Sequence, residues 1–203
     1  MKITVTNAGK RFNRQWIFRN LNHDLESGQH YAITGHNGSG KSTLLQAIAG
    51  SIYLNEGTIS YHHDQEPITP ENQFKHIGIC APYLEVIEEM TAIEFLTYHA
   101  NFKPFVQGFD QHNILDEIGL SQSKDKQIRY FSSGMKQRIK LAQAFFSDSS
   151  ILLLDEPCTN LDEKGISLYS HLISTHCRNR LVIISSNDKL EYASCSKEIR
   201  MGV

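Results

Sequence analysis

Residues 35–43 read Gly35-His36-Asn37-Gly38-Ser39-Gly40-Lys41-Ser42-Thr43 and match the phosphate-binding pattern G-x-x-x-x-G-K-[ST]. The glycines allow backbone angles that a Cβ would forbid, so the N–H groups of the loop can converge on phosphate oxygens. The helix expected after the loop points its positive end at the same anion. Lys41 adds a mobile cation for the outer phosphates, and the Ser42 hydroxyl is a ligand for Mg²⁺. The stretch therefore predicts a nucleotide site.

The flanking sequence supports this interpretation. Residues 31–34 form a short, largely apolar run typical of a buried strand, and residues 43–49 favour a helix that Gly50 ends. A phosphate-binding loop needs this order of strand, loop and helix. The alternative is a glycine-rich turn followed by a chance Lys-Ser pair. We disfavour it because the motif lies where the chemistry requires it.

Length and composition set the class of protein. The 203 residues suit one α/β domain, or one domain with a subdomain. No apolar run approaches the roughly 18 residues of a membrane span, and no basic and apolar leader opens the chain, so we do not expect secretion. The formal charge of −2 gives no electrostatic reason to expect nucleic acid as the main partner.

The cysteines and histidines show no metal-ligand spacing. The four cysteines are Cys80, Cys158, Cys177 and Cys195, and none forms a C-x-x-C pair. We therefore expect reduced thiols in a cytosolic protein, and we set a zinc site aside.

The N-terminal part of the chain predicts antiparallel strands. Residues 2–7 alternate apolar and polar side chains, and a second strand is expected at 16–25. Residues 10–13 between them are expected to form a turn that carries Phe12. This aromatic either stacks on a base above the phosphate loop or acts as a small hydrophobic plug. Further elements are expected at 56–61 (strand), 62–73 (loop) and 76–81 (strand).

Residues 84–149 change in character, and the pattern indicates helix throughout. Thr91 and Glu94 have the spacing of a capping box at the start of one helix. A second helix is expected from Asp110 to Gly119, again with an acidic first residue and a terminal glycine. We interpret this region as an insertion between the phosphate-loop half of the chain and the C-terminal strands.

Ser132 opens the most sharply patterned helix. One buried stripe is expected to hold Met135, Ile139, Ala142 and Phe146. The residues expected off this stripe are Lys136, Gln137, Lys140 and Gln143. The small residues Ser132, Ser133 and Gly134 leave backbone N–H groups open to an anion; an ordinary serine N-cap is the alternative.

An apolar run, Ile151 to Leu154, ends on two acids, Asp155 and Glu156. Such a run is typical of a central parallel strand, whose carboxyl end is where open α/β sheets bind ligands. Asp155 is suited to hold Mg²⁺, and Glu156 to take a proton from an attacking water. Two solvated acids in an exposed turn are the alternative, which the upstream phosphate loop disfavours.

The rest of the chain predicts one more helix and one more central strand. The helix is expected from Glu163 to Cys177 and the strand at 181–185. The strand leads to Ser186, Asn187 and Asp188. The tail, 191–203, is expected to add a short helix and a strand.

Together these motifs resemble the ATP-binding subunit of an ABC transporter over essentially the whole chain. Gly35–Thr43 corresponds to Walker A, and Ile151–Asp155 with Glu156 corresponds to Walker B and its catalytic glutamate. Phe131–Arg138 is similar to the family signature, normally Leu-Ser-Gly-Gly-Gln and a basic Gln-Arg stretch. Asn160-Leu161-Asp162 resembles the D-loop, and Phe12 lies where the family places its adenine-stacking aromatic.

The resemblance implies an α/β fold with a P-loop NTPase (RecA-like) core, an antiparallel β subdomain and an inserted α-helical subdomain. Residues 1–203 would form one ATPase domain, with the helical insertion at about 84–149. The implied ligands are ATP and Mg²⁺. Mg²⁺ would be held by Ser42 and Asp155, and catalysis would involve Glu156, Asp162 and Asn187.

The resemblance also implies partners. Two such domains, in a homodimer or a heterodimer, are expected to meet head to tail around two ATP molecules. Ser132, Ser133 and Gly134 of one chain would then act on ATP held by Walker A of the other. Closure and reopening would drive a separate transmembrane permease subunit touched by the helical insertion. The chain would lie in the cytoplasm, on the cytoplasmic face of the membrane.

The chain departs from the family pattern at four positions. Ser133 replaces a glycine of the signature and Met135 replaces its glutamine. Tyr83 is expected at the position of the Q-loop glutamine, and Asn187 at that of the switch histidine. Because an asparagine cannot become a cation, we expect slower hydrolysis than in a site with histidine.

Two other functions remain as alternatives. A DNA-repair, chromosome-structure or ribosome-acting ATPase of the same family would need coiled coils, a basic face or a second ATPase domain, which this chain does not show. The departures at Tyr83 and Asn187 are compatible with a regulatory module that uses ATP only to dimerise. Such a module would close on ATP without releasing phosphate, so turnover distinguishes it from a transporter subunit. The transported substrate, and whether it is imported or exported, depend on the membrane partner.

Overall fold

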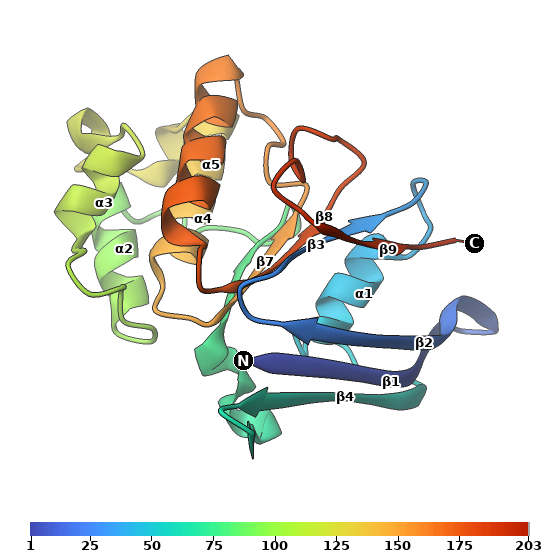
Figure 1. The fold of residues 1–203 in the computed structure, drawn as a ribbon. Coiled ribbons are helices and arrows are strands. Elements are labelled where there is room, and N and C mark those ends of the chain that lie inside the picture. Colours follow the sequence, from blue (N-terminus) through green and yellow to red (C-terminus); the bar gives the residue numbers. More distant parts are fainter. Residues whose placement is uncertain (203) are drawn as a thin grey trace.

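A computed structural model describes residues 1–202, and its strands form two sheets (Figure 1). The antiparallel sheet has the order β2-β1-β4-β5. Its strands are β1 (Lys2–Phe12), β2 (Gln15–Glu26), β4 (Glu56–His63) and β5 (Glu66–Pro67). The second sheet is parallel and has the order β6-β7-β8-β3-β9. Its strands are β3 (His30–Thr34), β6 (Ile77–Cys80), β7 (Ile151–Asp155), β8 (Leu181–Ser185) and β9 (Lys197–Arg200).

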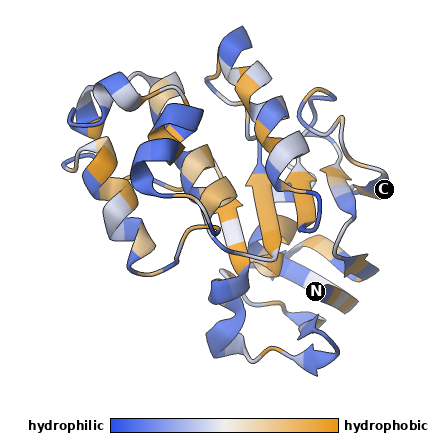
Figure 2. Ribbon diagram, turned by 60° about the vertical axis from the view of Figure 1, so that its left-hand side comes forward, coloured by the Kyte–Doolittle hydropathy of each residue, from blue (hydrophilic) through white to orange (hydrophobic). Residues whose placement is uncertain are grey.

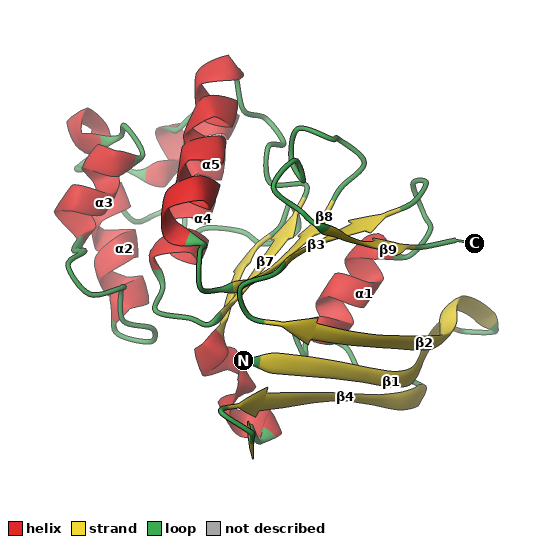
Figure 3. Cartoon of the chain, in the orientation of Figure 1, coloured by secondary structure: helices red, strands yellow, loops and turns green. Residues whose placement is uncertain are grey.

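The helices flank the parallel sheet (Figures 1 and 3). One helix, α1 (Lys41–Ile48), lies between the two sheets. The others lie on the far side of the parallel sheet, and they are α2 (Ala92–Ala100), α3 (Gln111–Glu117), α4 (Ser133–Phe146) and α5 (Glu163–His176). Three short 3₁₀ helices are η1 (Pro70–His76), η2 (Ser121–Ser123) and η3 (Ile128–Tyr130).

The central strands β7 and β8 are buried at every position and dominate the apolar core (Figure 2). Side chains of β7 alternate between two clusters. Ile151 and Leu153 pack with α1 and the antiparallel sheet, whereas Leu152 and Leu154 pack with α4 and α5. This two-sided burial is why the strand has a continuous apolar sequence, and the predicted central parallel strand is confirmed. The carboxyl ends of these strands are thereby held rigidly at one edge.

The predicted α/β fold with a P-loop core is confirmed, and several local predictions need correction. Residues 10–12 continue β1 rather than forming a turn, so the hairpin turn is confined to Asn13 and Arg14. Asn13 adopts φ 55°, a left-handed angle that asparagine tolerates in tight hairpins. The loop predicted at 62–73 is shorter, because β4 runs to His63 and β5 pairs with it.

The region 84–149 is not helical throughout. Only α2, α3 and α4 are α-helical there, and loops separate them. Pro104 lacks an amide donor, and Gly108 and Gly119 adopt left-handed angles of φ 91° and 70°, which interrupt the helical backbone. The predicted caps do form, since Thr91 and Asp110 each make a capping box.

Two further corrections concern α4 and the tail. Gln137, expected off the buried stripe of α4, is only 4% exposed. The stripe is wider than predicted because α4 packs against both β6 and α5. The tail forms turns at 191–194 instead of a helix, and β9 comes after them; Val203 lies outside the described residues.

Candidate nucleotide site

Three neighbouring strands bring the predicted site residues to one edge of the parallel sheet. β3 leads into the phosphate loop, β7 ends on Asp155 and Glu156, and β8 leads to Asn187. The sheet order places β7, β8 and β3 side by side, all parallel. Carboxyl ends of adjacent parallel strands meet, so residues far apart in sequence share one edge.

A cleft of about 250 Å³ opens at this edge. It is lined by Ile17, Asn37, Gly38, Gly40, Lys41, Ser42, Thr43 and Glu156. The phosphate loop and the acid after β7 therefore face the same space. Such a combination of loop amides, a lysine, hydroxyls and a carboxylate suits a triphosphate and an attacking water.

The glycines of the loop are required by space as well as by backbone angle. A Cβ on Gly35 would lie 2.6 Å from the backbone oxygen of Met201, and one on Gly40 would lie 2.4 Å from Ile17. Gly40 is the N-cap of α1 at φ 98°. At Gly38, φ is 82° and nothing lies within 4 Å of a Cβ position, so this glycine faces open space. The loop is thus packed on one side and open on the other.

The Lys41 side chain is held in place by carbonyl oxygens and has no acidic partner among the described residues. Its Nζ donates to the carbonyl oxygens of Gly35 at 2.9 Å and His36 at 3.4 Å. The side chain is only 7% exposed, and no ion pair within the described residues involves it. Because its partners are carbonyl oxygens and not a carboxylate, the ammonium is available to pair with an anionic ligand.

Asp155 supplies a direct test of whether a metal fits. The residue is 2% exposed, and its Oδ1 has no hydrogen-bond partner among the described residues. A buried, unpartnered carboxylate oxygen is costly unless a cation approaches it. Ser42 lines the adjoining cleft, so hard oxygen donors of the kind Mg²⁺ prefers occur in both places.

Glu156 occupies a strained backbone position. Its φ is 43°, which is unfavourable for a glutamate, and its N–H donates to the Ser185 carbonyl at 2.9 Å. The carboxylate reaches the cleft while Asp155 beside it stays buried. The two consecutive acids therefore differ in exposure, and only Glu156 lines the cleft.

The switch-position residue contacts the phosphate loop. Nδ2 of Asn187 donates to Oδ1 of Asn37 at 2.7 Å. Asn37 itself lines the cleft. Asn187 therefore stands one side chain away from the space where a terminal phosphate would lie.

Tyr83 also lies at this edge, after β6. Burial, with a smaller contribution from the nearby Asp155 carboxylate, raises the pKa of the Tyr83 phenol to about 12, although a hydrogen bond with Gln46 of α1 acts in the opposite direction. The phenol therefore stays neutral at physiological pH. Its single hydroxyl oxygen both donates and accepts, whereas an amide offers a carbonyl oxygen and a separate NH₂ group with two donors.

The signature residues line a different cleft. Its volume is about 480 Å³, and its lining includes Ser132, Ser133, Gly134, Asn160 and Asp162. No residue is shared between the linings of the two clefts. The chain therefore does not bring its own signature onto its own phosphate loop.

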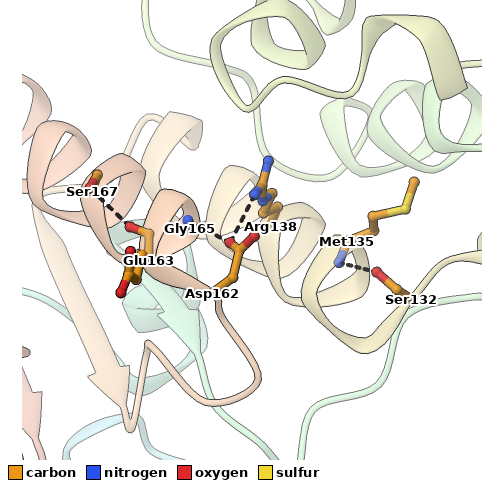
Figure 4. A network of polar contacts seen from close by, with 7 residues as sticks. All are labelled: Ser132, Met135, Arg138, Asp162, Glu163, Gly165 and Ser167. Atoms are coloured by element: carbon orange, nitrogen blue, oxygen red, sulfur yellow. Dashed lines mark hydrogen bonds and ion pairs between the residues drawn. The ribbon is translucent and has the colours of Figure 1, made fainter.

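Polar contacts join the signature helix to the D-loop (Figure 4). The Ser132 hydroxyl caps α4 by accepting from the Met135 N–H at 3.3 Å. Asp162 caps α5 by accepting from the Gly165 N–H at 2.8 Å, and it also accepts from Arg138 at 3.3 Å. The Gly165 bond, ahead of the Arg138 charge, keeps the pKa of Asp162 below its usual value. Asp162 is therefore a charged brace between α4 and α5.

Phe12 and three residues of the predicted phosphate loop, Gly35, His36 and Ser39, are not in the lining of the first cleft. Phe12 is 49% exposed at the end of β1, and the Lys10 ammonium lies 5.0 Å from its ring centre. His36 is exposed and contacts the Asn37 carbonyl through Nδ1 at 2.9 Å. Ser39 is buried, with its hydroxyl unpartnered among the described residues.

Sequence reasoning missed three residues near the site. Ile17 lines the phosphate cleft from β2, where it lies between Trp16 and Phe18, and nothing in this apolar run marks it as a site residue. Gln137 and Glu191 are buried beside the loop that follows Glu156. Nothing in their spacing marks them, since each lies in a segment whose sequence is typical of a surface.

Comparisons with known proteins agree with this geometry. The family model described as "ABC transporter" matches residues 18–159. An uncharacterised ABC transporter ATP-binding protein of Bacillus subtilis, YybJ, is 31% identical over 95% of this chain and 88% of its own. The cytochrome c biogenesis ATP-binding export protein CcmA of Haemophilus influenzae is 29% identical over 97% of this chain and 93% of its own.

Solved structures show the same fold. A putative ABC transporter ATP-binding protein from Pyrococcus furiosus superposes with a TM-score of 0.81 at 20% identity, covering 99% of this chain and 98% of that one. An ATP-binding subunit of an ABC transporter superposes with a TM-score of 0.83 at 21% identity, over 99% and 86% of the two chains. No helix of the described residues has the length and apolar character to cross a membrane.

Proposed function

The chain belongs to the ABC transporter family as an ATP-hydrolysing, nucleotide-binding subunit, and on this premise we propose that two chains form two composite sites, head to tail. One observation carries the proposal. The cleft with the phosphate loop and Glu156 lacks the signature, and the signature lies in a separate cleft of the same chain. Each cleft is half of a site, and a second chain supplies the other half.

In the proposed site the phosphate loop and Lys41 bind the triphosphate of ATP. Ser42 and Asp155 would hold Mg²⁺, which when bound neutralises charge on the phosphate oxygens. Glu156 accepts the proton of the attacking water as general base. Ser132 and the N–H groups at the start of the partner's α4 stabilise the terminal phosphate.

We propose that the ATPase cycle drives a membrane partner that binds the helical region. Aromatic and aliphatic side chains are exposed on the helical region and the loop before it. They are Tyr83 (44%), Leu84 (36%), Ile87 (37%), Tyr98 (43%) and Phe102 (66%). Large apolar side chains left exposed in this part of the chain are candidates for an interaction surface. We therefore place a separate permease subunit here, with this chain on the cytoplasmic face of the membrane.

Phosphate release from the purified chain tests this function. With ATP and Mg²⁺ we expect turnover and an ATP-dependent dimer in size-exclusion chromatography. With ATP and a chelator we expect a lower rate of phosphate release and a smaller fraction of dimer. ATP binding and dimerisation without phosphate release would instead support the regulatory module that uses ATP only to associate.

Asn187→His is expected to raise the rate of phosphate release. The asparagine amide already lies beside Asn37 of the phosphate loop, at 2.7 Å. An imidazole in this place can become a cation and make a charge-assisted hydrogen bond, which is about twice as strong as a neutral one. A rise of about tenfold corresponds to about 1.4 kcal/mol of transition-state stabilisation.

Steady-state phosphate release at saturating ATP measures this effect, with Asn187→Ala as the control that removes the hydrogen bond. The alanine variant should be slower than wild type. If histidine leaves the rate unchanged, the switch position does not limit hydrolysis in this chain.

A further inference from the structure

The loop after Glu156 contains a peptide unit that its own turn cannot satisfy. The Thr159 N–H donates to the Glu156 carbonyl at 3.1 Å, which closes a four-residue turn with Pro157 in its second position. The central peptide of such a turn joins Pro157 to Cys158. Its C=O and N–H take no part in the turn hydrogen bond. Both therefore need partners from elsewhere.

Two buried side chains supply those partners from opposite sides. Nε2 of Gln137, on α4, donates to the Pro157 carbonyl at 2.7 Å. Oε1 of Glu191, after β8, accepts from the Cys158 N–H at 2.7 Å. Gln137 is 4% exposed and Glu191 is 6% exposed. The Pro157–Cys158 peptide, which begins one residue after the strained Glu156, is thus held by both of its polar groups.

Each of the two side chains is itself anchored to a different part of the site. Gln137 lies one turn into the signature helix and also contacts Cys80 Sγ at 3.7 Å, at the end of β6. Glu191 hydrogen-bonds with Ser186, the residue before Asn187, and its carbonyl accepts from Tyr169 at 2.6 Å. The peptide therefore joins the signature helix to the switch segment.

We propose that Gln137 and Glu191 are positioning residues that clamp the Pro157–Cys158 peptide and thereby hold Glu156 in its catalytic orientation. The inference rests on the proposed role of Glu156 as general base. Without the clamp the central peptide can rotate, and only the backbone hydrogen bonds of Glu156 with Ser185 and Thr159 remain to maintain its φ of 43°. Because α4 also begins at the signature, a shift of that helix moves the base of the chain's own site.

The clamp needs a hydrogen-bond acceptor at Glu191 and does not need its charge. Desolvation raises the pKa of its carboxyl, and hydrogen bonds from Ser186 and the Cys158 N–H act in the opposite direction. Asp188 and Glu156 lie near it and raise the pKa further. An uncharged acceptor in the same place would serve the clamp equally well. Glu191 must only accept a hydrogen bond whereas Gln137 must donate one, so substitutions can test the two residues separately.

Exchanging glutamate and glutamine at the two positions changes the volume little, but the clamp predicts different effects on kcat. Glu191→Gln keeps an oxygen to accept from Cys158, so its kcat should stay within about twofold of wild type. Gln137→Glu keeps the volume but cannot donate to Pro157, so its kcat should fall about 10- to 100-fold, as misplaced catalytic groups do. KM for ATP should change little in either variant. Gln143→Glu makes the same charge change on the same helix and should leave kcat unchanged.

Equal behaviour of Glu191→Gln and Gln137→Glu overturns the clamp, since a role in filling volume predicts that both are harmless. A fall in ATP affinity without a fall in kcat also overturns it. Glu191→Ala and Gln137→Ala, followed by the double variant, add a second criterion. Because both act on one peptide, their effects on kcat should be less than additive.

Amide hydrogen exchange tests the clamp without any turnover. In the nucleotide-free wild-type chain the Cys158 amide should be protected, and Glu191→Ala should raise its exchange rate at least about tenfold while Glu191→Gln does not. Equal exchange in all three proteins contradicts the proposal. A wild-type chain that releases no phosphate would contradict the proposed function instead, and the exchange measurement would still decide the clamp.

Discussion

Phosphate release by the Glu156→Gln variant is expected to fall about 10²–10⁴-fold below wild type, while ATP binding survives. The carboxylate lines the phosphate cleft and is not occupied by any ion pair in the described part of the chain. A glutamine of the same shape can orient a water but cannot take its proton. The variant should therefore accumulate with ATP bound, as a dimer that hydrolysis no longer opens.

Phosphate release and size-exclusion chromatography measure both parts of this result. Glu66→Gln, which makes the same change at an exposed position of β5, should behave as wild type. A Glu156→Gln variant that retains the wild-type rate would exclude Glu156 as the base. Loss of ATP binding in the variant would show that the side chain serves affinity and not the chemical step.

The Lys41→Ala variant is expected to lose both affinity and turnover. Hydrogen bonds to charged groups contribute about 1.5–3 kcal/mol, so ATP affinity should fall about 10- to 150-fold. The same ammonium faces charge that develops on the phosphates, and loss of such a donor costs about 10²–10³ in kcat. The product of the two effects makes kcat/KM the most sensitive quantity.

Lys164→Ala is the matched control, since Lys164 is exposed on α5 and distant in sequence from the phosphate loop. Nucleotide titration measures the ATP affinity of each variant. Thermal unfolding without ATP measures its stability, so that a loss of affinity can be distinguished from a loss of folded protein. Because Lys41 donates to two loop carbonyls, a small loss of stability is expected in the variant. Unchanged affinity would mean that the ammonium stays with those carbonyls when ATP binds.

The elements that carry the nucleotide chemistry could be predicted from the sequence because their patterns are local. The strand before Asp155 is buried on both faces, so every residue in it is apolar. The phosphate loop requires glycine at fixed positions for steric reasons that a single sequence displays. The caps at Thr91, Asp110 and Ser132 likewise depend on residues only three positions apart.

The clamp could not be predicted, because its members meet only through the tertiary fold. Gln137 is separated from Pro157 by 20 positions and Glu191 from Cys158 by 33. A polar residue between Lys136 and Arg138 has the pattern of a solvated face, and only packing of α4 against β6 and α5 buries it. The separation of the two clefts is likewise a property of the sheet order and not of any motif.

The proposal that each site is built from two chains is tested most directly by mixing two inactive variants. Lys41→Ala disables the phosphate loop and leaves the signature intact. Gly134→Asp does the reverse, placing a negative charge in the signature cleft. Each variant alone should release almost no phosphate. In a mixed head-to-tail dimer one of the two sites has both halves intact.

The measurement is phosphate release from an equimolar mixture of these variants after exchange of subunits. Random pairing makes about half of the dimers mixed, so composite sites predict recovery of up to about a quarter of the wild-type rate. A mixture as inactive as its components would contradict composite sites. It would mean that each chain completes its own site and that the two clefts act separately.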